Sequence, residues 1–207
     1  MATKTIEIKK ASVKIATILI QGDSDLVLNK MNAPTSRALT EARKDKAKTL
    51  ERPNYWEEVI TSMHWYDGTP GDFSEEGLLN ALAVNSPCIS AFGLRKSFGD
   101  AVVRNEIDTY STKFFASVNI LAKGNLIPIK FAEHHIDEKL MSPKKGAPVL
   151  AKLNRFTGWS AEFTIQYLEN VYSLEQIVNI IDLAGFGLGI GSGRSSGYGR
   201  YHVANIK

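Results

Sequence analysis

The sequence predicts an α+β fold made of two β–α–β units with two long insertions. Three observations support this prediction. A strictly alternating strand covers 159–167, a capped helix follows over 173–184, and a short strand ends the unit at about 199–206. The front half carries similar elements, more widely spread. The order strand, helix, strand, given twice, is that of ferredoxin-like and RNA-recognition-motif-like folds.

The second unit has the clearer pattern. Trp159, Phe163 and Tyr167 lie on one face of the predicted strand, with polar residues between them, so this face should belong to the core. Ser173 and Gln176 have the spacing of a capping box, which places the helix start at Ser173. Gly185 is expected to end this helix in the left-handed conformation.

The first unit is predicted from weaker patterns. A β-branched run indicates a strand over 13–20, and an apolar stripe after Ser74 indicates a helix over 74–85. A strand near 98–104 would complete the unit. Residues 114–121 and 126–131 are expected to form a hairpin around Gly124 and Asn125. The whole chain, 1–207, is then one domain with insertions at about 21–73 and 105–158.

Composition excludes several classes of protein. The chain has 207 residues, and a single cysteine excludes an internal disulfide framework and any multi-cysteine zinc site. No apolar run approaches the roughly 18 residues of a membrane span, so we expect a cytoplasmic protein with no membrane partner. The net charge of +3 is too small to identify a partner by itself. No metal site and no cofactor are expected.

Glycine is the unevenly distributed residue. Seven of the 16 glycines lie between Gly185 and Gly199, in a segment that carries Arg194 and Arg200 and has no acidic residue through to the C-terminal Lys207. Neither dinucleotide nor ATP binding is expected, because no frame fits the glycine motifs of those sites and a helix precedes the loop. Such a loop can instead expose N–H groups to phosphate, or it can be a connector needed only for packing.

Two further segments are basic. Over 37–52 the expected contacts to a phosphate backbone are Arg37, Arg43, Lys44, Lys46 and Lys48. Over 142–155, read as a flexible loop, they are Lys144, Lys145, Lys152 and Arg155. A solvated helix face and an ordinary surface loop are the respective alternatives. Arg95, Lys96 and Arg104 form a third, weaker basic group.

The helix, the run from Gly187 to Tyr201 and the final strand together resemble the glycine-rich loop of the RAMP superfamily, the backbone subunits and crRNA endonucleases of CRISPR systems. The similarity is greatest to phage-encoded RAMP-like proteins, through Trp159, Gly189-Ile190-Gly191, Arg194 and Gly199-Arg200-Tyr201. Ser195 stands where that pattern has proline. The resemblance implies a ferredoxin-like fold, an insertion that acts as a thumb, and single-stranded nucleic-acid binding along a filament of repeated subunits.

The sequence therefore predicts a protein that binds single-stranded DNA or RNA, as a homo-oligomer or in a multi-subunit complex. The expected contacts in the loop are Gly189, Gly191, Gly193, Arg194, Gly197, Tyr198, Gly199 and Arg200, with Tyr201 a second stacking side chain. One alternative is an RNA endonuclease that uses His134 or His135, although neighbouring residues of a strand point in opposite directions. Another is a phage protein-binding module that mimics or blocks a CRISPR complex.

Overall fold

A computed structural model describes residues 10–30, 54–141 and 149–207. Its main sheet has the strand order β10-β1-β9-β6-β4-β3, and β5 pairs with β9 beside β6. The strands of this sheet are β1 (Val13–Gly22), β3 (His64–Trp65), β4 (Pro87–Ser90), β5 (Val118–Leu121), β6 (Leu126–Lys130), β9 (Ser160–Leu168) and β10 (Tyr201–Ile206). A second sheet contains β2 (Leu26–Leu28), β8 (Val149–Thr157) and β7 (Glu133–Met141).

Helices join these strands into the expected double β–α–β order. The helices are α2 (Tyr55–Thr61), α3 (Glu75–Val84), α4 (Ala91–Arg104), α5 (Thr112–Ser117) and α6 (Leu174–Gly187). The units β1–α4–β5 and β9–α6–β10 give the order β10-β1-β9-β5, with neighbours antiparallel. This is the ferredoxin-like arrangement, so the predicted fold class is confirmed. No helix in the described part of the chain is long and apolar enough to cross a membrane.

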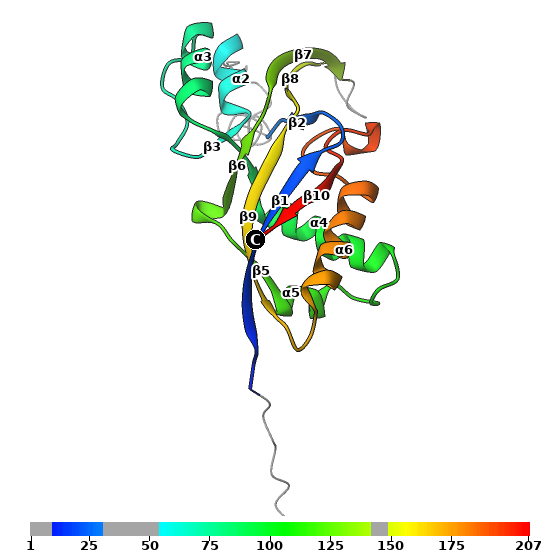
Figure 1. Ribbon diagram of the computed structural model, residues 1–207. Coiled ribbons are helices and arrows are strands. Elements are labelled where there is room, and N and C mark those ends of the chain that lie inside the picture. The colour runs from blue at the N-terminus through cyan, green and yellow to red at the C-terminus, as the bar shows by residue number, and fades with distance from the viewer. Residues whose placement is uncertain (1–9, 31–53, 142–148) are drawn as a thin grey trace, which may run out of the picture.

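The core lies between this sheet and the pair α4 and α6, which lie together against one of its faces (Figure 1). Ala161, Phe163 and Ile165 of β9 are buried, as the alternation predicted. Phe98 of α4 packs on Phe163, with 6.2 Å between ring centroids. The opposite face carries aliphatic and polar side chains such as Thr17 and Thr164, whose hydroxyl oxygens are 3.1 Å apart.

The helix α6 starts as predicted but ends later. Ser173 Oγ accepts from the Gln176 N–H at 3.2 Å, and the Gln176 side chain accepts from the Ser173 N–H at 2.9 Å, which is the expected capping box. Gly185 does not end the helix, which continues to Gly187. A Cβ on Gly185 would lie 1.9 Å from the Tyr201 carbonyl oxygen, so this glycine serves the close packing of α6 on β10.

The first β–α–β unit differs from the prediction in its helix. Residues 98–104 are not a strand but the second half of α4, whose buried Leu94, Phe98, Ala101 and Val102 follow helical spacing. The predicted helix over 74–85 exists as α3 but lies at the other end of the molecule, near α2 (Figure 1). Its expected apolar stripe is only partly correct, because Leu79 is 60 % exposed.

The predicted hairpin over 114–131 is also wrong. Gly124 and Asn125 both have a φ of 61°, so the turn exists, but residues 114–117 belong to α5. The two strands that flank the turn do not pair with each other. β5 pairs with Thr164–Tyr167 of β9, and β6 continues along the same strand at Ser160 and Ala161. The neighbouring strand β9 therefore takes the hydrogen bonds that a hairpin would have made internally.

Candidate nucleic-acid interface

The segment between Leu188 and Arg200 folds back on itself and connects α6 with β10. Gly189 and Gly199 have φ angles of 67° and 70° and are buried, and the Ile190 N–H donates to the Gly199 carbonyl at 2.9 Å. A Cβ on Gly199 would lie 1.9 Å from the Ile190 carbonyl oxygen. The structure therefore places these two glycines in the packing of the loop itself. Gly191, Gly193 and Gly197 lie at its surface.

The loop is held by the turn between β1 and β2. The Gly199 N–H donates to the Asp25 carbonyl, and the Ser192 N–H donates to the Val27 carbonyl, both at 2.8 Å. Ser24 Oγ donates to the Gly197 carbonyl at 2.8 Å and accepts from the Arg200 N–H at 2.9 Å. Because both sides of the loop are fixed in this way, its exposed tip has a defined position.

Three arginines line one hollow beside this loop. Its volume is about 380 Å³, and its lining includes Arg194 and Arg200 of the loop and Arg104 at the end of α4. The Arg200 guanidinium donates to the Phe186 carbonyl at 2.8 Å and to the Arg194 carbonyl at 3.4 Å. Within the described residues no carboxylate forms an ion pair with these arginines, and the acidic residue of the lining, Asp100, binds Lys96 Nζ at 2.9 Å.

A second, larger hollow of about 750 Å³ adjoins the first. Tyr198, half-buried against Gly193, lies on its loop side with Ser192 and Ser195, and the antiparallel pair β7–β8, which we call the hairpin, forms its other side. Tyr198 thus lies where a stacking side chain was expected. Tyr201 does not: it is 1 % exposed and packs edge-on against Trp159, with ring centroids 6.2 Å apart, so the prediction that it stacks on bases is wrong.

Two cations of β8, Lys152 and Arg155, are held by carboxylates. Residues 149–155, expected in a flexible loop, belong to β8. Lys152 Nζ lies 2.5 Å from Glu58 Oε2 and 4.6 Å from the centre of the Tyr55 ring. Arg155 binds Asp25 at 2.8 Å and Asp137 at 2.7 Å. Hydrogen bonds to these two carboxylates raise the pKa of Arg155. Both predicted contacts therefore carry charges that the chain itself already balances.

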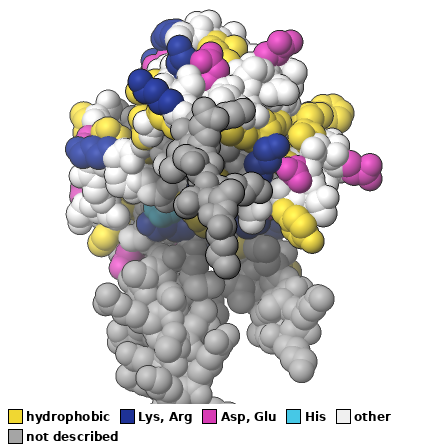
Figure 2. All heavy atoms as spheres, turned by 90° about the horizontal axis from the view of Figure 1, so that it is seen from below, with side chains coloured by type: hydrophobic (Ala, Val, Ile, Leu, Met, Phe, Trp, Pro, Cys, Tyr) yellow, Lys and Arg dark blue, Asp and Glu magenta, His cyan; other side chains and the backbone are white. Residues whose placement is uncertain are grey.

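Other predicted contacts are placed differently or not described. Arg37, Arg43, Lys44, Lys46, Lys48, Lys144 and Lys145 lie outside the described residues. Arg95 of the third basic group donates from Nε to the Val118 carbonyl at 2.9 Å, and burial lowers its pKa. On the face seen from below in Figure 2, basic, acidic and apolar side chains are interspersed.

The two adjacent histidines occupy different environments. His134 Nε2 lies 2.9 Å from Asn154 Oδ1, and its ring packs beside Phe156. The Asn154 amide donates to the Val59 carbonyl and to Ser62 Oγ, so its oxygen is the acceptor and His134 Nε2 carries the proton. Burial is the main cause that lowers the pKa of His134. His135 contacts the exposed Glu133 at 3.1 Å. This geometry gives His134 a role in holding the hairpin to α2.

Sequence reasoning missed the position of Arg104. Its basic group was noted, but the strand predicted over 98–104 placed it in the wrong element. The helical spacing of Leu94, Phe98 and Ala101 would have identified α4 and put Arg104 at its C-terminal end. That Arg104 shares a hollow with Arg194 depends on the packing of α4 beside α6, which no local pattern contains.

No family model matches the sequence, and no curated protein matches it. Solved structures do. A chain of the Type III-B Cmr-β complex bound to cognate target RNA matches with a TM-score of 0.50 and 12 % identity, over 94 % of this chain and 60 % of that chain. Cmr6 from Pyrococcus furiosus matches with a TM-score of 0.44 and 12 % identity, over 93 % and 98 %. The likeness to the Cmr-β chain shows the fold, and the expected ferredoxin-like fold class is confirmed.

Proposed function

We propose that this chain binds a single strand of nucleic acid, with RNA the first candidate, through the hollow lined by Arg104, Arg194 and Arg200. The single observation that carries the proposal is that three arginines line one hollow and that no described carboxylate forms an ion pair with them. A guanidinium always carries its charge and matches the geometry of phosphate oxygens. Three of them in one concave site suit a phosphate backbone better than a neutral ligand.

The neighbouring hollow favours a single strand of nucleic acid over a duplex as the ligand. Tyr198 offers an aromatic surface to an unstacked base, and the loop tip offers backbone groups to the sugar and phosphate. In this proposal the chain is one RAMP-like domain. Its insertions lie between β1 and α4 and between β5 and β9, not at 21–73 and 105–158, because β5 belongs to the core sheet. Strands β7 and β8 of the second insertion flank the bound strand. Several copies, or copies within a larger complex, lie along one strand. The RNA bound in the similar Cmr-β structure makes RNA the first choice over DNA.

The test is a binding titration with labelled single-stranded RNA, single-stranded DNA and duplex of equal length. The double variant R104E/R194E should weaken strand binding by at least about tenfold and reduce the salt dependence, because each phosphate contact to a single strand contributes a slope of about −0.7. Lys123→Glu is the control for each single reversal, since this exposed lysine makes the same charge change as one of the two substitutions, at the turn between β5 and β6. Equal affinity of the double variant and the wild type refutes the proposal.

A further inference from the structure

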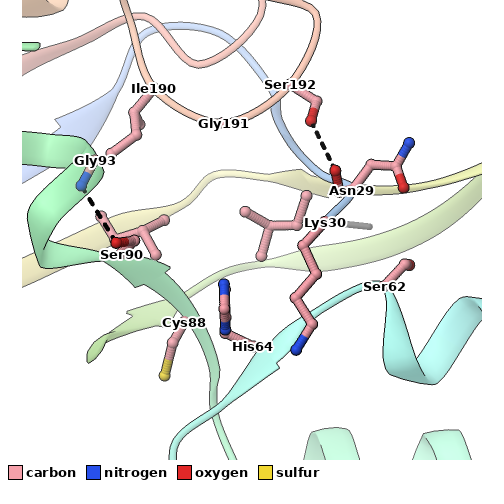
Figure 3. A pocket seen from close by; sticks show the side chains of 12 residues that line it. Asn29, Lys30, Ser62, His64, Cys88, Ser90, Gly93, Ile190, Gly191 and Ser192 are labelled. Carbon is pink, nitrogen blue, oxygen red and sulfur yellow. Dashed lines mark hydrogen bonds between the residues drawn. The ribbon is translucent and has the colours of Figure 1, made fainter. Parts of the chain in front are cut away.

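A third hollow lies on the other side of the glycine-rich loop, where that loop meets β2, β3 and β4 (Figure 3). Its volume is about 210 Å³. Leu28, Ile89 and Ile190 provide apolar walls, and Gly93 and Gly191 leave parts of the backbone bare. An apolar cavity of ~150 Å³ holds a benzene ring. This pocket therefore has room for one heteroaromatic ring with its exocyclic groups.

Most polar groups of this pocket are already engaged with each other or with the core. Ser62 Oγ donates to the Val59 carbonyl, and Ser192 Oγ donates to the Asn29 carbonyl. Ser90 Oγ accepts from the Gly93 N–H and lies 3.1 Å from the Asn125 amide nitrogen. These contacts fix the walls of the pocket and leave few groups to meet a ligand.

The polar side chains that remain are Lys30, His64 and Asn29, and in Figure 3 the Asn29 amide is directed away from Lys30 and His64. In Figure 3 the Lys30 side chain extends past the pocket toward His64. Burial lowers the pKa of both groups, and the charge of Lys30 lowers that of His64 further. Neither forms a hydrogen bond or ion pair with another side chain of the described residues. A lysine ammonium donates and cannot accept, so a ligand here must bring acceptor oxygens or nitrogens.

The pocket continues the surface proposed for the strand. Asn29 and Ser192 line both this pocket and the hollow beside Tyr198. Ser195 in turn lines both the Tyr198 hollow and the arginine hollow. The three hollows therefore follow one another along the loop, with guanidinium groups at one end and an apolar pocket at the other. A strand held by its phosphates at the arginines can reach this pocket with a base.

We propose that this pocket receives one unstacked pyrimidine base of the bound strand and prefers uracil or thymine to adenine. The inference rests on the proposed strand binding and adds a base preference to it. The small apolar volume suits a single ring, and Lys30 supplies a donor to the carbonyl oxygens that uracil and thymine present. Adenine is the larger base, and its exocyclic group is an amino donor, so it can meet Lys30 only through ring nitrogens and has no carbonyl oxygen to offer.

The test compares RNA oligomers of uridine and of adenosine, equal in length and at fixed salt. The wild type should favour the uridine oligomer, and Lys30→Met should reduce the ratio of the two affinities about fivefold through loss of uridine binding alone. The stacking of adenosines within the free oligomer affects wild type and variant equally. It therefore drops out when the affinity ratio is compared between the two proteins. Lys123→Met is the matched control. His64→Gln, which leaves Lys30 in place, should alter the ratio less, and circular dichroism checks that each variant is folded.

Three results overturn the inference. Equal weakening of both oligomers by Lys30→Met, with a smaller salt slope, assigns Lys30 to a phosphate. An unchanged ratio in Lys30→Met shows that the pocket does not read the base, while strand binding itself stands. A wild-type protein that binds neither oligomer refutes the proposed function, and the base preference with it.

Discussion

Arg200 and Arg155 are both guanidinium groups close to the turn between β1 and β2, and their partners differ. Arg200 is held by the carbonyl oxygens of Phe186 and Arg194, which orient it and leave its charge uncompensated. Arg155 is held by the carboxylates of Asp25 and Asp137, which cancel its charge. The glycine-rich end is therefore fixed by close backbone packing and keeps its cations for a ligand. The hairpin is fixed by its cations.

The difference teaches that the number of basic residues in a segment does not predict a phosphate site. Lys152 and Arg155 satisfied the same criterion in the sequence as Arg194, but their partners are 94 and 130 residues away in the chain. Only the fold shows which lysines and arginines are already paired. The predictions that follow separate the two kinds of support, from the largest expected effect to the smallest.

Gly185→Ala should cause the largest loss of stability. The new Cβ would lie 1.9 Å from the Tyr201 carbonyl oxygen and 2.7 Å from its ring, so α6 must move away from β10. We expect unfolding to become easier by about 3 kcal/mol. Urea unfolding followed by circular dichroism measures this.

Gly187→Ala is the matched control in the same helix. A Cβ at Gly187 meets nothing within 4 Å, and alanine favours helix over glycine. This variant should be as stable as the wild type or slightly more stable. Equal losses in the two alanine variants would mean that the contact of Gly185 with β10 does not fix this end of the molecule.

Arg155→Met should have the second largest effect, and on stability alone. It removes charged hydrogen bonds that join β8 to β7 and to the turn before β2, with a cost of about 1–2 kcal/mol for partly exposed groups. Because the chain already balances this charge, strand affinity of the folded protein should stay within about twofold of wild type.

The converse result is expected at the loop. Arg194→Met should leave the urea midpoint unchanged, because Arg194 is exposed and its side chain makes no ion pair within the described residues. It should weaken strand binding severalfold. If Arg155→Met weakens binding as much as Arg194→Met, the division between structural and ligand-binding cations is wrong.

The sequence patterns that worked were local ones. Alternation identified β9, and the spacing of Ser173 and Gln176 located the start of α6, because strand faces and helix caps are decided within a few residues. The helix α4 was missed because Gly93 and Gly99 lie within it, and glycine inside a segment argues against a helix. Gly99 stands in the middle of α4 because a Cβ there would lie 2.2 Å from the Phe115 ring, a contact that only the tertiary structure reveals.

The candidate site was predictable only in part. The run of glycines and its arginines pointed to the loop, and Tyr198 lies at a hollow as expected. Arg104, Lys30 and His64 come from other elements and join the site through packing, so no spacing in the sequence connects them. Two of the expected glycine contacts, Gly189 and Gly199, proved to be parts of the internal structure of the loop.

The smallest predicted effect is the pH dependence of stability. It distinguishes the hairpin, which a titrating histidine supports, from the arginine hollow, whose guanidinium groups keep their charge. His134 of β7 hydrogen-bonds to Asn154 of β8, which in turn donates to the Val59 carbonyl of α2, and burial lowers the pKa of His134 from the ordinary 6.5. The unfolded chain therefore binds a proton more readily than the folded chain. The stability that depends on neutral His134 is complete above pH 6.5 and is lost as the pH falls through and below that value.

Between pH 7.5 and 5.5 this loss should stay below about 1 kcal/mol for one histidine. His134→Gln keeps a donor for Asn154 and should remove part of the pH dependence of urea unfolding, while His64, whose pKa is also lowered, retains the rest. Guanidinium groups do not titrate in this range, so a pH that loosens the hairpin should leave the arginine hollow charged. Identical pH dependence in His134→Gln and wild type would remove His134 from the supports of the hairpin.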